Sequence, residues 1–298
     1  MTLAILLTRR SHLKILSPVI DAALRRGHDT IVVSEIRAAK RGDTLNPRDV
    51  ARLWPAARHE RTLTPWLYDA LIGLESCLPS VTTTKLIGVD HFYDCWVRGE
   101  GRRGDHFTMA WHSDYHRDMH LKLWGYNPQG VVVGWLPADQ LANIPIYPDR
   151  RTAVLFALKM AVPEPWRHSR QGRRDYYRIV RQVRDRAHAE GLRFVVKTRA
   201  KNRDPWWLRW LADEYVGDES MVPATSLYRL ADAEWCVHFE SGAGLEAALM
   251  GAYSIAVQVP QPHIIDLPGG RLQYGGVAMH QWPGVNGYGW SDRPSWYI

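Results

Sequence analysis

Cysteine is scarce in this chain of 298 residues, and the scarcity excludes two kinds of protein. The three cysteines, Cys77, Cys95 and Cys236, are odd in number and form no C-x-x-C pair. A disulfide framework needs an even set of cysteines, and a cysteine zinc site needs closely spaced pairs. The sequence therefore argues against both and favours a reduced, cytoplasmic protein.

Long hydrophobic runs are also missing. No apolar run approaches the roughly 20 residues that a membrane-spanning helix needs. The run Leu3–Leu7 is too short for the core of a signal peptide and is expected to form a buried strand instead. No segment is low in complexity, and the 46% apolar content with 14 Trp can fill sizeable interiors. At this length, two globular domains of about 150 residues each are expected.

Acidic residues are rare in one stretch of the chain. Residues 167–209 contain 14 of the 38 Lys and Arg but only 4 of the 31 Asp and Glu. This concentration of positive charge predicts a surface that meets a polyanion, and the alternative is a solvated, arginine-rich helix without a partner. Trp206, Trp207 and Trp210 lie beside these cations, where they suit stacking on bases, although core packing of their helix is the more common explanation.

Apolar segments alternate with helical segments along the whole chain. Strands are expected at 3–7, 31–33, 85–89, 107–111, 131–133, 152–158, 193–197, 235–239 and 252–259. Helices are expected from Pro18 to Gly27 with Ser17 as N-cap, from Ser113 to Leu123, at 175–189, at 205–212 with Asp204 as cap, and from about Leu245. This alternation predicts an α/β protein whose parallel sheets are covered on both faces.

The proline-bearing segment 144–150 is expected to link two Rossmann-like domains, residues 1–143 and 151–298. Two such domains form a cleft, and ligands of open parallel sheets bind beyond the carboxyl ends of the strands. The tail, residues 263–298, shows no clear period and yields no assignment.

A turn of small residues, Ser241, Gly242, Ala243 and Gly244, separates a predicted strand from a predicted helix. Unpaired N–H groups and the helix dipole favour a phosphate at such a place. Glu246 lies in the first helical turn, where its carboxylate could accept hydrogen bonds from ribose hydroxyls. The alternative is a turn whose small residues serve only close packing of helix on sheet.

The order of these motifs resembles glycosyltransferases of the GT-B fold, which has two Rossmann-like domains. The nearest branch contains CDP-glycerol glycerophosphotransferases and UDP-N-acetylglucosamine epimerases. The resemblance covers roughly residues 1–260 and implies that the 241–244 turn holds the donor diphosphate and Glu246 the ribose. Lys197 matches the family's Lys-x-His-Pro motif, but Arg199 replaces the histidine and no proline follows, which weakens the glycerophosphotransferase assignment. Arg199 could still pair with a donor phosphate.

The segment Leu86–His91 is similar to the family strand that delivers a histidine base to the cleft. Asp90 and His91 are adjacent at the end of a strand, so only one of the two is expected to face the ligand. We prefer Asp90 narrowly as the base, with His91 as the family-derived alternative; the pair could also simply cap a loop.

His112, His116 and His120 recur every four residues, which is a possible zinc-binding spacing. A solvated or acceptor-facing stripe is the favoured interpretation, and no metal is expected, because the family chemistry needs none.

Arg9, Arg10, His12 and Lys14 follow the first strand and are expected to face the cleft from the acceptor side. A small acceptor does not require so many cations, whereas a nucleic acid does. The leading hypothesis is therefore a cytoplasmic glycosyltransferase with a nucleotide-sugar donor, UDP-sugar favoured, and a polyanionic acceptor. The specific hypothesis is DNA carrying a 5-hydroxymethylpyrimidine, the substrate of bacteriophage DNA glucosyltransferases, whose base must leave the stack.

Two alternatives remain open. One is transfer onto a cell-envelope polymer or a lipid-linked acceptor, where the basic residues would meet anionic membrane. The other is a non-catalytic nucleic-acid-binding protein on a GT-B scaffold. Fold analogy does not establish an acceptor, so the sequence does not decide among them.

Overall fold

The computed structural model describes residues 1–35, 43–74, 77–79, 85–89, 107–114, 117–118, 129–134, 136–158, 169–198, 204–239, 241–257, 263–267, 270–274 and 295–297. The chain divides into two compact units. The first comprises Met1–Gln140 and Asp266–Gly270, and the second Leu141–Ile265 and Arg271–Ile298. None of the helices among these described residues is long and apolar enough to cross a membrane.

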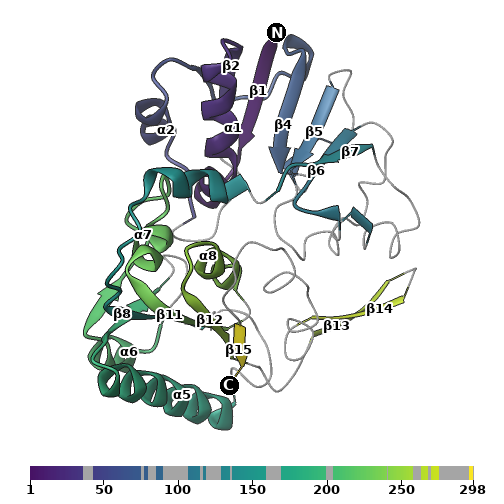
Figure 1. Ribbon diagram of the computed structural model, residues 1–298. Coiled ribbons are helices and arrows are strands. Elements are labelled where there is room, and N and C mark those ends of the chain that lie inside the picture. Colours follow the sequence, from purple (N-terminus) through teal and green to yellow (C-terminus); the bar gives the residue numbers. More distant parts are fainter. Residues whose placement is uncertain are drawn as a thin grey trace. The chain divides into compact units, whose positions relative to one another are not determined.

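The first unit is built on a seven-stranded parallel sheet in the order β3-β2-β1-β4-β5-β6-β7 (Figure 1). Its strands are β1 (Thr2–Leu7), β2 (Asp29–Ser34), β3 (Arg58–Glu60), β4 (Ala70–Leu74), β5 (Lys85–Val89), β6 (Phe107–Trp111) and β7 (Gly130–Val132). Its helices are α1 (Leu13–Arg25) and α2 (Pro47–Leu53), with short 3₁₀ segments η1 (Arg10–His12) and η2 (Pro65–Leu67). A further 3₁₀ segment, η5 (Leu136–Asn143), runs from the first unit into the second. Strand β1 is buried from Leu3 onward because it lies in the middle of the sheet.

The second unit is built on a six-stranded sheet in the order β10-β9-β8-β11-β12-β15. Its strands are β8 (Thr152–Phe156), β9 (Arg193–Lys197), β10 (Glu214–Val216), β11 (Ala233–His238), β12 (Tyr253–Ala256) and β15 (Ser295–Tyr297). Its helices are α5 (Arg170–Ala189), α6 (Trp206–Leu211), α7 (Thr225–Ala231) and α8 (Ala243–Leu249). A separate pair of strands, β13 (His263–Leu267) and β14 (Gly270–Tyr274), forms a two-stranded sheet.

Two apolar clusters cover the two faces of the second sheet. Alternate residues of β8 divide between them: Ala153 and Leu155 pack under α5 and α6, whereas Val154 and Phe156 pack under α7 and α8. Figure 1 shows the same two pairs of helices on opposite sides of these strands. The predicted pattern of parallel strands buried between helices is confirmed.

Both sheets have the strand order of a Rossmann fold, in which the chain starts at a central strand, moves to one edge, and then returns to fill the other side. The direction reverses between β1 and β4 in the first unit and between β8 and β11 in the second. Open parallel sheets bind ligands beyond the carboxyl ends of the strands at this reversal. In the first unit Arg9–Lys14 follows β1 at this place, and in the second unit the 241–244 turn follows β11.

The first helix begins earlier than its sequence predicts. Helix α1 starts at Leu13, so Ser17 is not its N-cap and Pro18 lies inside it. A proline inside a helix has no N–H for the carbonyl four residues before it, here that of Lys14. The side-chain amide of Gln140 supplies the missing donor: its Nε2 lies 2.6 Å from the Lys14 carbonyl oxygen and 3.0 Å from the Ser17 hydroxyl. The helix therefore tolerates Pro18 because a distant residue of the same unit satisfies its backbone.

Replacing Gln140 with leucine is expected to lower the free energy of unfolding by about 1–2 kcal/mol, because a buried carbonyl loses its donor. The measurement is urea denaturation of both proteins. The control repeats the change in a Pro18→Ala background, where the restored N–H of residue 18 can bond the Lys14 carbonyl. The cost should shrink there, and an equal cost in both backgrounds would refute the assigned role of Gln140.

Other boundaries also differ from the predicted ones. Helix α5 begins at Arg170 rather than Asp175 because the Ser169 hydroxyl caps it, accepting the Gly172 N–H at 2.8 Å. Asp204 does not cap α6; its carboxylate accepts hydrogen bonds from the Thr198 and Tyr215 hydroxyls instead.

The segment 144–150, predicted to link the two domains, belongs to the second unit and packs on it. Ile144 is buried in the cluster under α7 and α8, and the Tyr147 N–H donates to the Ala231 carbonyl at 3.3 Å. The tail contributes β15, which pairs with β12 in parallel, and the β13–β14 pair. No periodicity in the sequence predicts these strands.

Candidate functional site

The 241–244 turn connects β11 to α8 at the carboxyl edge of the second sheet. Several of its amides already have acceptors within or beside the turn. The Ser241 N–H points to His238 Nδ1 at 3.4 Å, the Ala243 N–H to the Ser241 hydroxyl at 3.3 Å, and the Gly244 N–H to the Ser241 carbonyl at 3.0 Å. Among the described residues, the Gly242 N–H has no acceptor. Fewer N–H groups of the turn are therefore uncovered than the sequence predicts. The hydrogen bonds of the Ser241 and Ala243 N–H groups, at 3.4 and 3.3 Å, are long.

The 241–244 turn packs on His238, which was not among the candidate site residues predicted from the sequence. Its ring is buried, and a Cβ on Gly244 would lie 2.2 Å from His238 Nε2. Because Nδ1 accepts the Ser241 N–H, we assign the ring proton to Nε2, which donates to the Ser254 hydroxyl at 3.2 Å. Gly244 is therefore required by the close approach of this ring. The sequence signal was a histidine that ends an apolar strand just before a glycine turn.

Glu246 lies in α8 with its side chain buried against α7, where Oε2 accepts a hydrogen bond from the Ser226 hydroxyl at 3.2 Å. Burial, and then the Glu246 carboxylate, raise the pKa of the Cys236 thiol well above its usual value. Cys236 therefore stays a neutral thiol in the core of β11 and supplies no nucleophile.

Lys197 ends β9, and its side chain is buried. Its Nζ lies 2.5 Å from Asp218 Oδ1, just beyond β10, and 2.5 Å from the Thr198 carbonyl oxygen. The ammonium charge is therefore balanced by a carboxylate within the same unit. Arg199, the second cation predicted to contact the donor, lies outside the described residues.

The predicted acceptor residues of the first unit separate into two groups. Arg9 is exposed, and Arg10 and Lys14 are half-buried. His12 differs from the expectation, because it is buried. Its Nδ1 accepts the Thr8 N–H at 3.3 Å, and its Nε2 lies 4.0 Å from Cys77 Sγ, so the ring packs inside the unit.

The start of η1 is hydrogen-bonded to a carboxylate from a later part of the first unit, that of Asp43. Asp43 is buried, and its two oxygens accept hydrogen bonds from Ser11, one from the N–H at 2.9 Å and one from the hydroxyl at 3.2 Å. The Arg10 N–H donates to the Asp43 carbonyl at 3.0 Å. Asp43 thus takes the place where an anion would dock at the start of η1.

The predicted base lies outside the described residues, which end at Val89 in β5 and resume at Phe107 in β6; this gap contains both Asp90 and His91. His116 and His120 also lie outside them. Within the described part of the chain, no group of three or more His, Cys, Asp or Glu could hold a metal ion.

His112 follows β6 and is buried, with Nδ1 3.3 Å from the Gly134 carbonyl oxygen. Burial lowers the pKa of His112 to about 4, against the weaker opposing effect of the bond to Gly134. The imidazole is therefore neutral at neutral pH and cannot act there as a cation on a ligand-facing stripe.

The depressed pKa of His112 predicts a pH-dependent stability. Between pH 6.5 and 4 the unfolded chain binds a proton that the folded chain does not, so stability is lost as pH falls. From pH 7 to pH 5 this loss amounts to about 2 kcal/mol. In His112→Asn the amide can still donate to Gly134 but does not titrate, so we expect the variant to lack this loss of unfolding free energy. Urea denaturation of both proteins at pH 7 and pH 5 measures it. A stability difference between variant and wild type that stays constant with pH would contradict the assignment.

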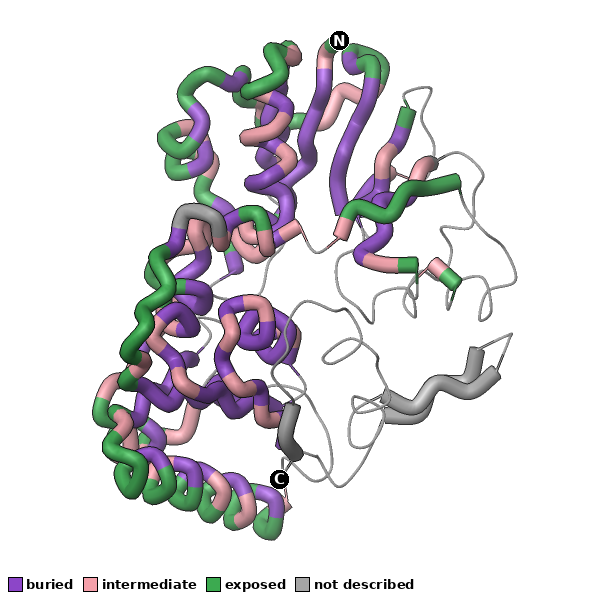
Figure 2. The backbone as a smooth tube through the Cα atoms, in the orientation of Figure 1, coloured by how far each residue is buried: buried purple, intermediate pink, exposed green. Residues whose placement is uncertain are grey.

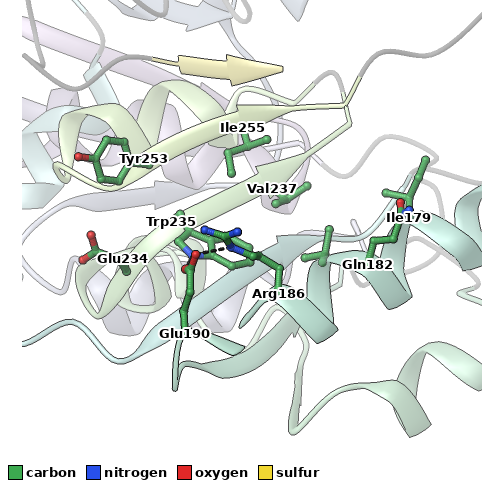
Figure 3. A pocket seen from close by; sticks show the side chains of 10 residues that line it. Ile179, Gln182, Arg186, Glu190, Glu234, Trp235, Val237, Tyr253 and Ile255 are labelled. Carbon is green, nitrogen blue, oxygen red and sulfur yellow. Dashed lines mark hydrogen bonds and ion pairs between the residues drawn. The ribbon is translucent and has the colours of Figure 1, made fainter. Parts of the chain in front are cut away.

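A hollow of about 800 Å³ lies elsewhere in the second unit, between α5 and the face of β11 and β12 (Figure 3). Trp235, Val237, Tyr253 and Ile255 form its apolar wall. At one end Glu190 accepts a hydrogen bond from the Trp235 indole at 2.8 Å and pairs with Arg186. The hollow follows the face of the sheet rather than the edge that carries the 241–244 turn, so we do not include it in the candidate site.

Comparisons with known proteins bear on the fold. No protein-family model and no curated protein matches the sequence. A putative UDP-N-acetylglucosamine 2-epimerase from Listeria monocytogenes is similar, with a TM-score of 0.54 and 11% identity over 87% of this chain and 79% of that one. An E. coli heptosyltransferase with ADP has a TM-score of 0.43 and 16% identity over 100% and 93%. A glycotransferase of kitacinnamycin has a TM-score of 0.49 and 12% identity over 99% and 86%. The chain thus has the GT-B fold of two Rossmann-like units, which glycosyltransferases and epimerases share.

Proposed function

We propose that the chain is a nucleotide-sugar-dependent glycosyltransferase that moves a sugar onto a hydroxyl of a polyanionic acceptor. One observation carries the proposal. The 241–244 turn, made of four small residues, follows β11 at the reversal of strand order in the second sheet. A Rossmann fold binds nucleotides at this reversal, where small residues let the backbone approach a diphosphate.

In the proposed reaction a base takes the proton of the acceptor hydroxyl as its oxygen attacks the anomeric carbon of the donor sugar. The bond from that carbon to the diphosphate oxygen breaks, and the nucleoside diphosphate leaves with the electron pair. We assign the base to Asp90 or His91, and the stabilisation of the leaving diphosphate to the 241–244 turn with Arg199. Lys197 belongs to the proposed donor site through its place at the end of β9, although its ammonium is paired with Asp218.

Glu246 belongs to the proposed donor site, as the acceptor for ribose hydroxyls, through its place in α8, although its carboxylate is buried and bonded to Ser226. In the first unit we assign acceptor contacts to Arg9, Arg10 and Lys14, with buried His12 holding their segment through Thr8. The favoured donor is a UDP-sugar, and no step requires a metal.

The proposed acceptor is DNA carrying a 5-hydroxymethylpyrimidine. The support is the cationic segment after β1 and the arginine-rich helix α5, since both suit a polyphosphate better than a small neutral acceptor. The base must leave the stack before its hydroxyl can reach the donor.

The test incubates the protein with 5-hydroxymethylcytosine DNA and UDP-glucose, digests the DNA to nucleosides, and measures their masses by mass spectrometry. A hexose adduct is expected, and its absence with every common nucleotide-sugar donor would refute the DNA acceptor.

Calorimetric titration with UDP tests the donor site separately. Asp90→Asn and His91→Ala identify the base, because the variant that removes it loses turnover and still binds UDP. Wild-type turnover in both variants would exclude the pair.

A further inference from the structure

Helix α5 carries several positive charges in its first turns. Arg170, Arg173 and Arg174 occupy its first turns, and no acidic residue lies in the first turn. Cations near a helix N-terminus oppose the helix dipole, which favours acids there. The arrangement therefore costs stability, and a purely solvated surface helix would not need it.

These arginines share one face of the helix. Arg170, Arg173, Arg174, Tyr177 and Arg181 recur at intervals of three and four residues, which places them along one stripe, here called the arginine face. The apolar residues of α5 are in the core, so the helix turns its buried side to the sheet and its charged side to solvent (Figure 2).

The cations of α5 differ in how they are paired. Arg178 pairs with Asp175 at 2.9 Å, Arg184 bonds Asp185 at 2.6 Å, and Arg186 pairs with Glu190. By contrast, within the described residues Arg170, Arg174 and Arg181 have no carboxylate at ion-pair distance. These three arginines all belong to the arginine face. Helix α5 follows β8 and so begins at the edge of the sheet that carries the 241–244 turn.

Aromatic rings adjoin the arginine face. Tyr177 meets Trp207 of α6 edge to face, with ring centres 5.0 Å apart, and Arg181 lies 6.0 Å from the Tyr177 ring centre. With Arg170, Arg173 and Arg174, these two rings line a hollow of about 590 Å³.

Two further rings of α6 project into solvent. Trp206 and Trp210, the tryptophan pair, are 74% and 81% exposed and touch each other edge to face at 6.1 Å. Such exposure of two large apolar side chains is unusual unless something stacks on them. Core packing, the common role of tryptophan, applies to neither ring, whereas Trp207 does pack on Tyr176 at 5.4 Å.

We propose that the arginine face and the tryptophan pair form a binding surface for a nucleic-acid strand with unpaired bases. Arginine guanidinium groups pair bidentately with phosphates, and exposed aromatic rings stack on bases of any sequence. The surface recruits the strand to the edge of the second sheet. The inference rests on the proposed function in one respect only, namely that the acceptor is a nucleic acid.

An anionic membrane is the competing partner, and the structure disfavours it. A helix that lies on a membrane inserts an apolar face between the lipids. The apolar face of α5, with Tyr176, Val180 and Val183, is already buried against the sheet. The exposed side of α5 offers arginine and tyrosine, which match phosphates and bases rather than acyl chains.

The test measures the affinity for a fluorescent oligodeoxythymidine of about 20 nucleotides by anisotropy at several salt concentrations. The triple variant Arg170→Ala/Arg174→Ala/Arg181→Ala should bind at least about 10-fold more weakly, and its salt slope should fall by about 2, since each lost phosphate contact removes about 0.7. Trp206→Ala/Trp210→Ala should also bind at least about 10-fold more weakly with little change in slope, and Trp206→Phe/Trp210→Phe should retain most of the affinity.

The matched control is Arg26→Ala/Arg52→Ala/Arg61→Ala, which removes the same charge from exposed positions of the first unit. Equal losses in the control and the test variant, or no binding by the wild type, would overturn the proposal. So would flotation with phosphatidylglycerol vesicles that depends on the same residues while the oligonucleotide does not bind. UDP titration of each variant keeps the two proposals apart: absence of UDP binding by the wild type refutes the transferase and leaves the strand-binding surface standing.

Discussion

Replacing Lys197 with methionine is expected to lower the free energy of unfolding by about 3–5 kcal/mol. The side chain is buried, and its Nζ bridges the Asp218 carboxylate and the Thr198 carbonyl at the ends of β9 and β10. Methionine fills a similar volume but leaves the half-buried Asp218 carboxylate without its counter-charge. Urea denaturation followed by circular dichroism measures the effect.

Arg193→Met is the matched control, because it removes a cation from the other end of the same strand. Arg193 pairs with Glu214 at 3.2 Å, but its side chain is 53% exposed, so the expected cost is at most about 1 kcal/mol. The double variant Lys197→Met/Asp218→Leu should regain most of the stability, since an apolar pair of similar size replaces both charges. Equal costs for Lys197→Met and Arg193→Met would contradict the buried pair.

The double variant also separates two roles of Lys197. If Lys197 contacts the donor diphosphate as proposed, the stable double variant should bind UDP more weakly than wild type. Unchanged UDP affinity would restrict Lys197 to holding β9 and β10 together.

Gly244→Ala is expected to cost about 3 kcal/mol of stability and to weaken UDP binding about 100-fold. The new methyl group would lie 2.2 Å from His238 Nε2, far inside contact distance. The ring cannot simply turn away, because its nitrogens bond Ser241 and Ser254 on both sides. The start of α8 must therefore move away from β11, and the turn proposed to hold the diphosphate moves with it.

Calorimetry with UDP and urea denaturation measure the two effects of Gly244→Ala. Gly217→Ala is the control within the same unit, since a Cβ there meets nothing within 4 Å. It should leave both the stability and the UDP affinity close to wild type. Wild-type UDP affinity in Gly244→Ala would show that the turn does not hold the donor.

The general architecture was predictable because it depends on local patterns. Strands such as β1 and β8 are apolar on both faces, and this pattern is typical of parallel strands buried between helices. The 241–244 turn was recognisable because four small residues interrupt an otherwise apolar strand and helix. Two kinds of strand were missed. The outer strand β3 reads Arg-His-Glu, which has no apolar residue to signal a strand. The central strand β4 is apolar and buried throughout, yet it was not predicted either.

The contacts around Pro18 and within the candidate site depend on how the helices and strands pack on one another. Local rules put Pro18 at a helix start, and only the donor from Gln140, 123 residues beyond Ser17, explains its place inside α1. Likewise, nothing in the sequence pairs Lys197 with Asp218, so its charge appeared available for a ligand. The contact between His238 and Gly244 depends on how α8 crosses the end of β11, which no spacing rule supplies.

The cap made by Asp43 has a consequence for how the two halves treat phosphate-bearing ligands. The halves share one strand order, so symmetry alone would give each a similar affinity for a nucleotide. At the start of η1, however, the Ser11 amide is bound to the Asp43 carboxylate, whereas beside α8 the corresponding acceptor is the neutral Ser241 hydroxyl. In the proposed reaction a phosphate of the acceptor would therefore contact the side chains of Arg9, Arg10 and Lys14 rather than the amides of η1, while at the 241–244 turn only a neutral hydroxyl competes with a phosphate for the amides. One buried carboxylate thereby makes two architecturally equivalent halves chemically distinct.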